Sequence, residues 1–295
     1  MSDRATAFAL AFDSEFKSQT AGLSPKEIPL FRALHRALVA AGTRLAVEEY
    51  HGTSYQVGFS GNGSYARVHA RCELSDLLII VFTRNPPAAR ITYLQAKSER
   101  RMFPSPCRHS FSANLEQWFL LRNRPPIAGF GNFAPPADLL SSAILPSVGS
   151  FGFFYRTHNG LYEIYYASAA QLQPPTTYSQ RYGSLVPVGG CGVIIASGHL
   201  ECVAACGSVP FAESLYRLEI GTPIDPSISR AASTRSWLTG NLRKIQQATP
   251  TIGGRREIVD ELVSLLRAED TPDHSPSGQL GAKNIIVIRS DYRPN

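Results

Sequence analysis

ELSDLLIIVF at residues 73–82 and ITYLQAK at residues 91–97 are the two stretches of sequence that decide the fold. The first contains an unbroken apolar run from Leu77 to Phe82, which is typical of a strand buried on both faces in the middle of a sheet. Two consecutive prolines follow this run, and the second stretch predicts the neighbouring strand. Together the two stretches predict a β-hairpin at the centre of an α/β protein.

Periodicity in the rest of the chain predicts helices and further strands around that hairpin. Apolar residues recur at helical spacing over residues 25–41, where Ser24 and Glu27 suit a capping box at the start of the helix. Residues 112–121 predict a second helix and residues 258–267 a third. Further strands are expected at 55–59, 65–69, 151–155, 161–166, 193–196 and 285–288.

The expected fold is therefore α/β, with a mixed central β-sheet flanked by helices. At 295 residues the chain is long for a single domain, so we expect a core in residues 1–150 and a C-terminal extension in residues 151–295. The extension is expected to be β-rich or mixed. It either adds strands to the same sheet or recognises DNA, a partner protein or a small signalling ligand, and the sequence does not choose between these alternatives.

The cysteines and the apolar segments indicate the compartment. Five cysteines without a CxxC pair argue against a disulfide framework, so reduced thiols are expected. The apolar segment at residues 5–12 is too short for a signal or membrane segment and is followed by Asp13 and Glu15. We therefore expect a soluble cytoplasmic protein with no membrane partner.

The charge of the chain is moderately basic. Hydrophobic residues make up 43% of the sequence and charged residues 18%, with a formal net charge of +6 and a pI near 9.1. This excess favours a polyanionic partner. Five arginines near the second apolar stretch either guide a phosphate backbone or form a solvated face. They are Arg100, Arg101, Arg108, Arg122 and Arg124.

Polar residues stand at the ends of the two predicted central strands. Asp76 opens the first strand, and Gln95 and Lys97 close the second. Because side chains alternate across a strand, Gln95 and Lys97 project from one face, which Asp76 can approach from the neighbouring strand. Phosphodiester hydrolysis needs an anionic oxygen ligand for Mg²⁺, a second oxygen ligand, and a cation for the attacking hydroxide or the developing charge. Asp76, the Gln95 amide oxygen and Lys97 supply these groups in that order.

The same segment resembles the core of the PD-(D/E)xK nuclease superfamily, in the Gln-x-Lys form of Mrr-type restriction enzymes. The resemblance covers about residues 25–125 and implies a restriction-endonuclease-like core with Asp76, Gln95 and Lys97 as catalytic residues. It also implies Mg²⁺ or Mn²⁺ as the cofactor. The family's expected chemistry is metal-dependent hydrolysis.

Gln95 replaces the family's usual second carboxylate, so the metal site carries less negative charge. Metal ligands are expected from Asp76 and Gln95. Glu73 is the first candidate to restore the charge as a further ligand, with Glu48 or Glu49 as alternatives. Metal affinity and the number of metal ions stay open.

The resemblance implies an endonuclease that hydrolyses phosphodiester bonds in DNA, with a role in bacterial restriction or anti-phage defence. Partners beyond DNA would be a second copy of the chain or another protein of a defence system. The alternative is a nucleic-acid-binding or regulatory protein that keeps the fold without cleavage. Aromatic residues between Phe153 and Tyr182, with Arg156 and Arg181 among them, could stack bases, but strand cores and hairpin pairs explain them better.

Overall fold

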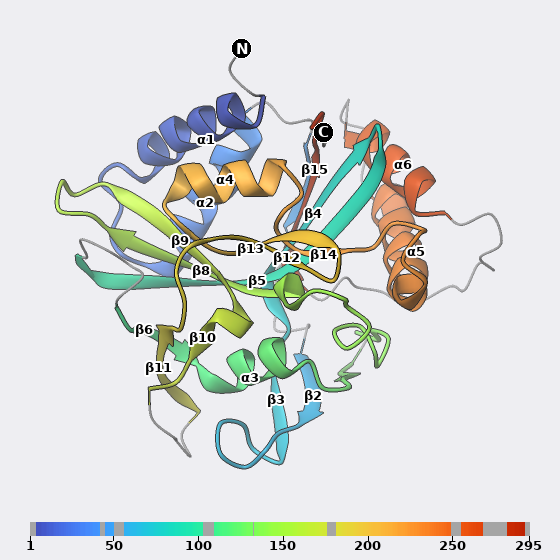
Figure 1. Cartoon of the computed structure of the whole chain (residues 1–295), viewed down its shortest axis with the longest axis horizontal. Helices are drawn as coiled ribbons and strands as arrows, with labels where there is room; N and C mark the ends of the chain where they lie inside the picture. The colour runs from blue at the N-terminus through green and yellow to red at the C-terminus, as the bar shows by residue number, and fades with distance from the viewer. Residues whose placement is uncertain are drawn as a thin grey trace.

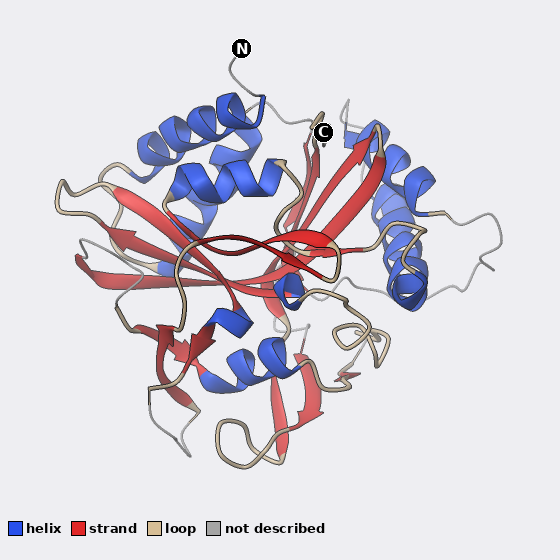
Figure 2. Cartoon of the chain, in the orientation of Figure 1, coloured by secondary structure: helices blue, strands red, loops and turns tan. Residues whose placement is uncertain are grey.

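A mixed nine-stranded β-sheet forms the centre of the protein, with helices packed on both of its faces (Figure 1, Figure 2). The structure is a computed structural model, and it describes residues 4–41, 45–49, 56–102, 109–131, 133–175, 181–248, 255–267 and 282–292. The strand order in the sheet is β1-β15-β4-β5-β8-β9-β13-β12, and β14 pairs with β5 beside this path. The expected class, α/β with a mixed central sheet flanked by helices, is therefore confirmed.

The central sheet consists of β1 (Leu45–Glu49), β4 (Ser75–Arg84), β5 (Pro87–Met102), β8 (Gly149–Arg156), β9 (Tyr162–Ser168), β12 (Gly192–Ala196), β13 (His199–Cys206), β14 (Thr222–Pro223) and β15 (Ala282–Arg289). One three-stranded sheet contains β6 (Phe111–Asn114), β10 (Leu172–Gln173) and β11 (Tyr182–Pro187), and another contains β2 (Gln56–Ser60), β3 (His69–Glu73) and β7 (Ala128–Gly129). The helices are α1 (Arg4–Thr20), α2 (Glu27–Ala40), α3 (Leu115–Asn123), α4 (Ser208–Tyr216), α5 (Ala232–Ala248) and α6 (Arg255–Leu266).

Strands β4 and β5 form the predicted central hairpin. They pair antiparallel, with Leu77 opposite Leu94, and the turn between them contains a cis peptide bond at Asn85-Pro86. Every residue of the apolar run from Leu77 to Phe82 is only 0–1% exposed. The run is therefore a strand covered on both faces, as its composition predicts.

The two faces of this hairpin pack against separate apolar cores. Leu77 and Leu94 belong to one core, which contains side chains from α1, α2 and α4. Leu78 and Tyr93 belong to the other, which contains side chains from α3, α5 and α6. In Figure 1, α1, α2 and α4 are gathered together, and α5 and α6 lie apart from them. Because neighbouring residues of each strand face different cores, the position of a polar residue along its strand decides which face of the sheet it occupies.

The sheet takes strands from both sides of residue 150, where the boundary between core and extension is expected. β8 begins at Gly149 and pairs parallel with β5, so the boundary falls within this strand. β15 is formed by the C-terminal segment and pairs parallel with β4. The C-terminal half therefore adds strands to the same sheet, which is one of the two alternatives that the sequence leaves open.

Two helices precede the central hairpin, and the sequence predicts only the second of them, α2. Residues 5–12 lie in α1, whose buried side chains pack with those of α2 and α4. Helix α2 begins at Glu27 after Lys26, with no side-chain hydrogen bond at its cap, so the expected capping box of Ser24 and Glu27 is wrong. Within the described ranges, no helix is both long and apolar enough to cross a membrane.

The helix expected at residues 112–121 begins later, because its first residues form a strand. This strand is β6, which pairs antiparallel with β11. Helix α3 follows directly, and Asn114 Oδ1 accepts a hydrogen bond of 3.0 Å from Glu116 N at its start. The expected hairpin near residues 55–69 is present as β2 and β3, with its second strand displaced to His69–Glu73.

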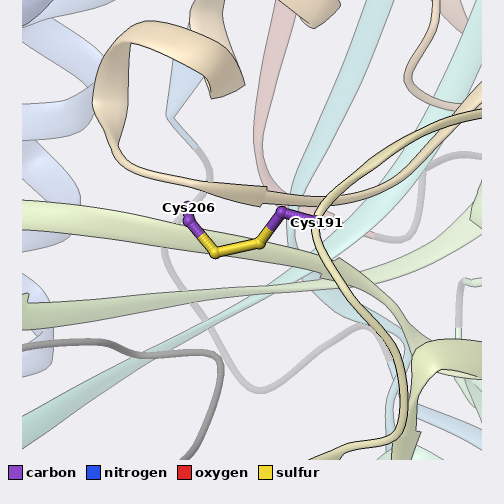
Figure 3. The surroundings of a disulfide bond; sticks show 2 residues. All are labelled: Cys191 and Cys206. Carbon is purple, nitrogen blue, oxygen red and sulfur yellow. A yellow bond between two sulfur atoms is a disulfide. The ribbon is translucent and has the colours of Figure 1, made fainter.

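Cys191 and Cys206 form a disulfide bond, so the expectation of reduced thiols is wrong for this pair (Figure 3). The antiparallel pairing of β12 with β13 is the physical reason, because it brings the two cysteines together with their Cα atoms 6.1 Å apart. Spacing does not reveal the pair, since the two residues are 15 positions apart in the chain. Cys72 and Cys202 are free and buried.

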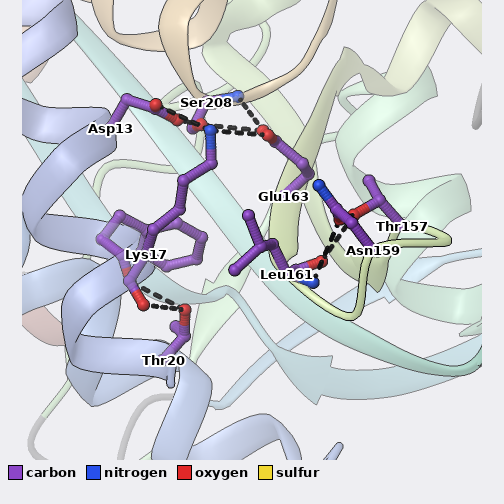
Figure 4. A network of polar contacts seen from close by, with 9 residues as sticks. Asp13, Lys17, Thr20, Thr157, Asn159, Leu161, Glu163 and Ser208 are labelled. Atoms are coloured by element: carbon purple, nitrogen blue, oxygen red, sulfur yellow. Dashed lines mark hydrogen bonds and ion pairs between the residues drawn. The ribbon is translucent and has the colours of Figure 1, made fainter.

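A polar network connects α1 to β9 and α4 (Figure 4). Lys17 Nζ lies 2.7 Å from Asp13 Oδ2 and 3.1 Å from Glu163 Oε1. Ser208 donates from its backbone N to Glu163 Oε2 at 2.8 Å, and its hydroxyl contacts Asp13. The three charged side chains are partly buried, with exposed fractions of 29% for Lys17, 16% for Asp13 and 17% for Glu163. The network holds the N-terminal helix against the C-terminal half of the chain.

Candidate active site

The candidate site lies where the central hairpin opens, at the start of β4 and in the second half of β5. Asp76 comes directly before Leu77, and Gln95 comes directly after Leu94, which is the partner of Leu77 in the ladder. Asp76 and Gln95 are therefore neighbours on adjacent strands. By alternation both point to the face opposite that of Leu77 and Leu94, and Lys97 points to the same face as Gln95.

Asp76 and Lys97 lie close together. Asp76 Oδ2 accepts a hydrogen bond of 3.0 Å from Ala96 N and is 3.7 Å from Lys97 Nζ. The ammonium group of Lys97 also donates to Ala96 O at 2.8 Å and lies 3.5 Å from Glu27 Oε2. The predicted proximity of Asp76 to Lys97 is thus present in the structure. Their roles in catalysis stay a prediction.

Gln95 is fully buried, and its amide oxygen has no hydrogen-bond partner among the described residues. Its Nε2 donates to Leu74 O at 3.3 Å, which sets the orientation of the amide. Its Oε1 accepts no hydrogen bond from any residue that the structure describes. A buried acceptor without a hydrogen bond lowers the stability of the folded protein by about 1–3 kcal/mol. Such a cost is expected where a further ligand, such as a cation or a water molecule, completes the site.

A cleft of about 700 Å³ lies in front of Lys97. Most of its wall is polar, and its charged residues are Glu27, Glu73, Lys97 and Arg181. Glu73 ends β3, so the first candidate for an additional carboxylate does lie in the cleft. Its role as a metal ligand stays a prediction.

Glu27 is the site residue that sequence reasoning missed, because it was assigned to helix capping. Helix α2 presents it to the cleft from the first helical position. A contact between distant segments places this helix start beside β5, where Ser98 Oγ donates to Pro25 O at 3.3 Å. The sequence shows only that Glu27 is an acidic residue at the start of a helix. Many helices without a functional site begin in the same way, so this signal does not identify Glu27 as a site residue.

The two alternative carboxylates lie on a different strand from the site. Glu48 and Glu49 belong to β1, which is separated from β4 by β15 in the sheet order. Their backbone pairs with β15 rather than with the central hairpin. Their side chains fall outside the part of the chain that the structure describes.

Cys72 lines the cleft but is unsuited to nucleophilic chemistry. Burial raises the pKa of its thiol well above the ordinary value, and the nearby charge of Glu116 raises it further. A thiol must lose its proton to become a strong nucleophile. Covalent catalysis by Cys72 is therefore disfavoured, and the chemistry of the cleft rests on its oxygen and nitrogen groups.

Two of the five predicted phosphate-guiding arginines have structural partners instead. Arg122 Nη1 donates to Leu172 O at 2.6 Å, and Arg124 Nη1 donates to Ala143 O at 2.9 Å. Burial lowers the pKa of Arg124. These contacts attach the end of α3 to β10 and to the loop at Ala143, so both guanidinium groups serve packing.

The remaining three predicted arginines follow Lys97 in the chain. Arg100 is exposed on β5. Arg101 has its backbone in β5, and its side chain falls outside the described residues, as does the whole of Arg108. Guidance of a phosphate backbone stays a prediction for these three residues. The arginine that lines the cleft is Arg181, which the sequence did not assign to the phosphate-guiding set.

The side chains of the site fit a divalent cation through oxygen ligands. Among the described residues, no three His, Cys, Asp or Glu side chains group as a metal site. Gln95 belongs to none of these four residue types. Its buried Oε1 and the Asp76 carboxylate are hard oxygen donors of the kind that Mg²⁺ and Mn²⁺ prefer.

Comparisons with models of protein families, with curated proteins and with solved structures find no match to this chain. The functional conclusion therefore depends on the chemistry of the cleft.

Proposed function

We propose that the chain is a Mg²⁺- or Mn²⁺-dependent endonuclease that hydrolyses phosphodiester bonds in DNA. The observation that carries this proposal is the buried Gln95 Oε1, which has no hydrogen-bond donor among the described residues and lies on the strand next to Asp76. Asp76 Oδ2 is in turn 3.7 Å from Lys97 Nζ at the edge of the cleft. A carboxylate and an amide oxygen can hold a divalent cation, and a nearby ammonium group can stabilise the negative charge that develops during hydrolysis of a phosphodiester.

Each residue of the proposed site has a distinct role. Asp76 and Gln95 would hold the metal ion, and Glu73 or Glu27 would add negative charge from the cleft wall. A bound divalent cation polarises a phosphoryl oxygen and lowers the pKa of a bound water. The Lys97 ammonium would orient the attacking water and stabilise the negative charge that develops on the phosphate. The hydrogen bond from Ala96 N holds the Asp76 carboxylate in place for this task.

The order of elements supports a PD-(D/E)xK-like core as part of the proposal. Helix α2, the hairpin of β4 and β5, and helix α3 follow one another as in the resemblance. A role in bacterial restriction or anti-phage defence, with a cytoplasmic location and DNA as the partner, belongs to the same proposal. A second copy of the chain or a defence-system protein would be a further partner.

A non-catalytic nucleic-acid-binding protein is the second candidate function. The observation in its favour is that the described residues contain no cluster of three His, Cys, Asp or Glu side chains for a metal. Such a protein would keep the positive groups of the cleft and bind nucleic acid without cutting it. Metal-dependent cleavage separates the two candidates.

Nicking of a supercoiled plasmid tests the proposed function. Wild-type protein is expected to nick the plasmid with Mg²⁺ or Mn²⁺ and to be inactive in EDTA. Asp76→Asn is expected to reduce the rate at least about 100-fold, since loss of even an outer-shell partner of a metal ligand costs about 10- to 100-fold in affinity or activity. Asp138→Asn is the matched control, because Asp138 is exposed and bonds Ser233 Oγ at 2.9 Å outside the cleft. Plasmid that stays intact with wild-type protein and both metals would favour the second candidate.

A further inference from the structure

The cleft has a second wall, which β11 and the start of α3 form. Arg181 and Tyr182 line this wall, in the same cleft as Lys97. Leu115 N donates to Arg181 O at 2.8 Å, and Tyr182 pairs with Asn114 between β11 and β6. The backbone of both residues is therefore anchored. The proposed hydrolysis assigns no role to either side chain.

A buried carboxylate positions the guanidinium group of Arg181. Glu116 has a side chain that is 1% exposed, and its oxygens lie 3.6 Å from Arg181 Nε and 2.6 Å from Arg67 Nε. Arg67 Nη2 donates a further hydrogen bond of 3.1 Å, so Arg67 holds Glu116 through two nitrogens. Two guanidinium groups against one carboxylate leave an excess of positive charge. Arg181, with a side chain 46% exposed, can present that charge to an anion in the cleft.

Tyr182 differs from the buried aromatic residues of the central sheet. Phe153, Tyr165 and Tyr166 are 0–1% exposed, as strand cores require, whereas Tyr182 is 65% exposed. The guanidinium carbon of Arg181 lies 5.6 Å from the centroid of the Tyr182 ring. An open aromatic ring beside a cation is the combination with which proteins bind a base and its adjoining phosphate.

We propose that Arg181 and Tyr182 bind a single-stranded segment of nucleic acid, with a phosphate on Arg181 and an unstacked base on Tyr182. This inference rests on the proposed function, because it names the substrate class of the same cleft. Both faces of a base inside a duplex are covered by its neighbours, so Tyr182 can stack only on a base that lies outside a double helix. The cleft volume of about 700 Å³ is in the range that encloses a small ligand, which suits single nucleotides.

Binding of a labelled single-stranded DNA oligonucleotide, followed by fluorescence anisotropy in EDTA, tests the site without cleavage. Tyr182→Ala is expected to weaken binding about 5- to 150-fold, which corresponds to 1–3 kcal/mol for one stacked base. Tyr182→Phe keeps the ring and is expected to retain the wild-type affinity. Thermal melts of both variants are expected to match wild type, since the side chain is exposed.

The phosphate contact is tested by salt dependence. Arg181→Ala is expected to reduce the slope of log K against log salt by about 0.7, the value for one phosphate on a single strand. Glu116 keeps its two bonds to Arg67 in this variant. Arg156→Ala is the matched control, because Arg156 lies at the same 5.6 Å from an aromatic ring, that of Tyr162, and is not part of the cleft wall. Its affinity and salt slope are expected to equal those of wild type.

Equal affinity of wild type and Tyr182→Ala for the single strand would overturn the proposal. So would a mononucleotide that binds as tightly as the oligonucleotide, because the site would then be a small-molecule pocket. The outcome is distinguishable from failure of the proposed function, since the binding assay contains no metal. If the protein binds the single strand through Tyr182 but never nicks plasmid, the endonuclease proposal is refuted and the single-strand binding site is supported. If the protein nicks plasmid but binds the single strand equally well without Tyr182, the endonuclease proposal is supported and the single-strand binding site is refuted.

Discussion

Replacing Gln95 by methionine tests whether its buried amide serves the fold or a bound cation. The two side chains have similar length, and the flexible methionine can fill the space of the amide. The substitution removes the hydrogen bond from Nε2 to Leu74 O and the unpaired Oε1 at the same time. Stability and metal response should therefore change in different ways.

The two losses affect stability with opposite signs. A neutral hydrogen bond contributes about 0.5–1.5 kcal/mol, and an unsatisfied buried acceptor costs about 1–3 kcal/mol. The Gln95 bond to Leu74 O is long at 3.3 Å, so its contribution belongs at the low end of its range. The relief of Oε1 therefore exceeds the lost bond, and we expect Gln95→Met to raise the free energy of unfolding by about 0.5–2.5 kcal/mol in EDTA.

The response to metal should be lost in the same variant. A metal at 100 times its Kd stabilises the wild-type protein by about 2.7 kcal/mol. For a large domain this corresponds to a rise in Tm of about 5–10 °C. Differential scanning fluorimetry with and without Mg²⁺ or Mn²⁺ measures this rise. Gln95→Met should melt at or above the wild-type temperature in EDTA and show little or no further rise with metal.

A second glutamine provides the control for this experiment. Gln117 lines the cleft beside Lys97 and is 7% exposed, and Gln117→Met should keep the rise in Tm with metal. Destabilisation of Gln95→Met by more than about 3 kcal/mol would show that the amide serves the fold. An undiminished rise in Tm with metal would exclude Gln95 Oε1 as a ligand.

Three further predictions concern stability. Lys17→Met should lower the free energy of unfolding by about 2 kcal/mol in denaturant titrations, a value between those of exposed and buried ion pairs. Arg4→Ala is the control and should change this free energy by less than about 0.5 kcal/mol, because the ion pair of Arg4 is exposed. Burial alone lowers the pKa of Lys17, but hydrogen bonds and charges from its two carboxylate partners raise the pKa overall above the ordinary value of 10.5. The stabilisation by Lys17 is therefore complete below the pKa of the unfolded state and is lost as pH rises through the pKa of the folded state. Cys191→Ser should cost about 3 kcal/mol by opening a loop closed across 15 positions, and wild-type protein in a reducing agent should melt at the same lower temperature. Ile195→Lys, at a position 78% exposed on the edge strand β12, should leave Tm unchanged and reduce light scattering on heating, because a charge on an edge opposes strand-to-strand aggregation.

The centre of the fold can be predicted from sequence because its signals are local. The run from Leu77 to Phe82 is apolar at every position, which is typical of a strand in the interior of a sheet. Alternation then places Gln95 and Lys97 on one face, and the structure adds Asp76 beside them with Oδ2 3.7 Å from Lys97 Nζ. The spatial grouping of the candidate site therefore follows from two strands and their pairing.

The rest of the site depends on contacts between distant segments. Glu27 reaches Lys97 only because the start of α2 packs beside β5, and this packing has no signature in the spacing of residues. The charges of Arg122 and Arg124 predict contact with solvent or phosphate, but their guanidinium groups donate to the carbonyl groups of Leu172 and Ala143. The position of β15 between β1 and β4 likewise comes from tertiary pairing.

The rate of metal-dependent plasmid nicking by Lys97→Met tests the central claim most directly. Lys97 is 17% exposed and lies between Asp76 and Glu27, at 3.7 Å and 3.5 Å. Loss of one preorganised group that stabilises the transition state costs about 10²- to 10³-fold in rate, and we expect a loss of this size with Tm close to wild type. Lys244→Met, on α5, should nick at the wild-type rate. Nicking by folded Lys97→Met at the wild-type rate, or equal nicking by wild type in EDTA, would contradict the account.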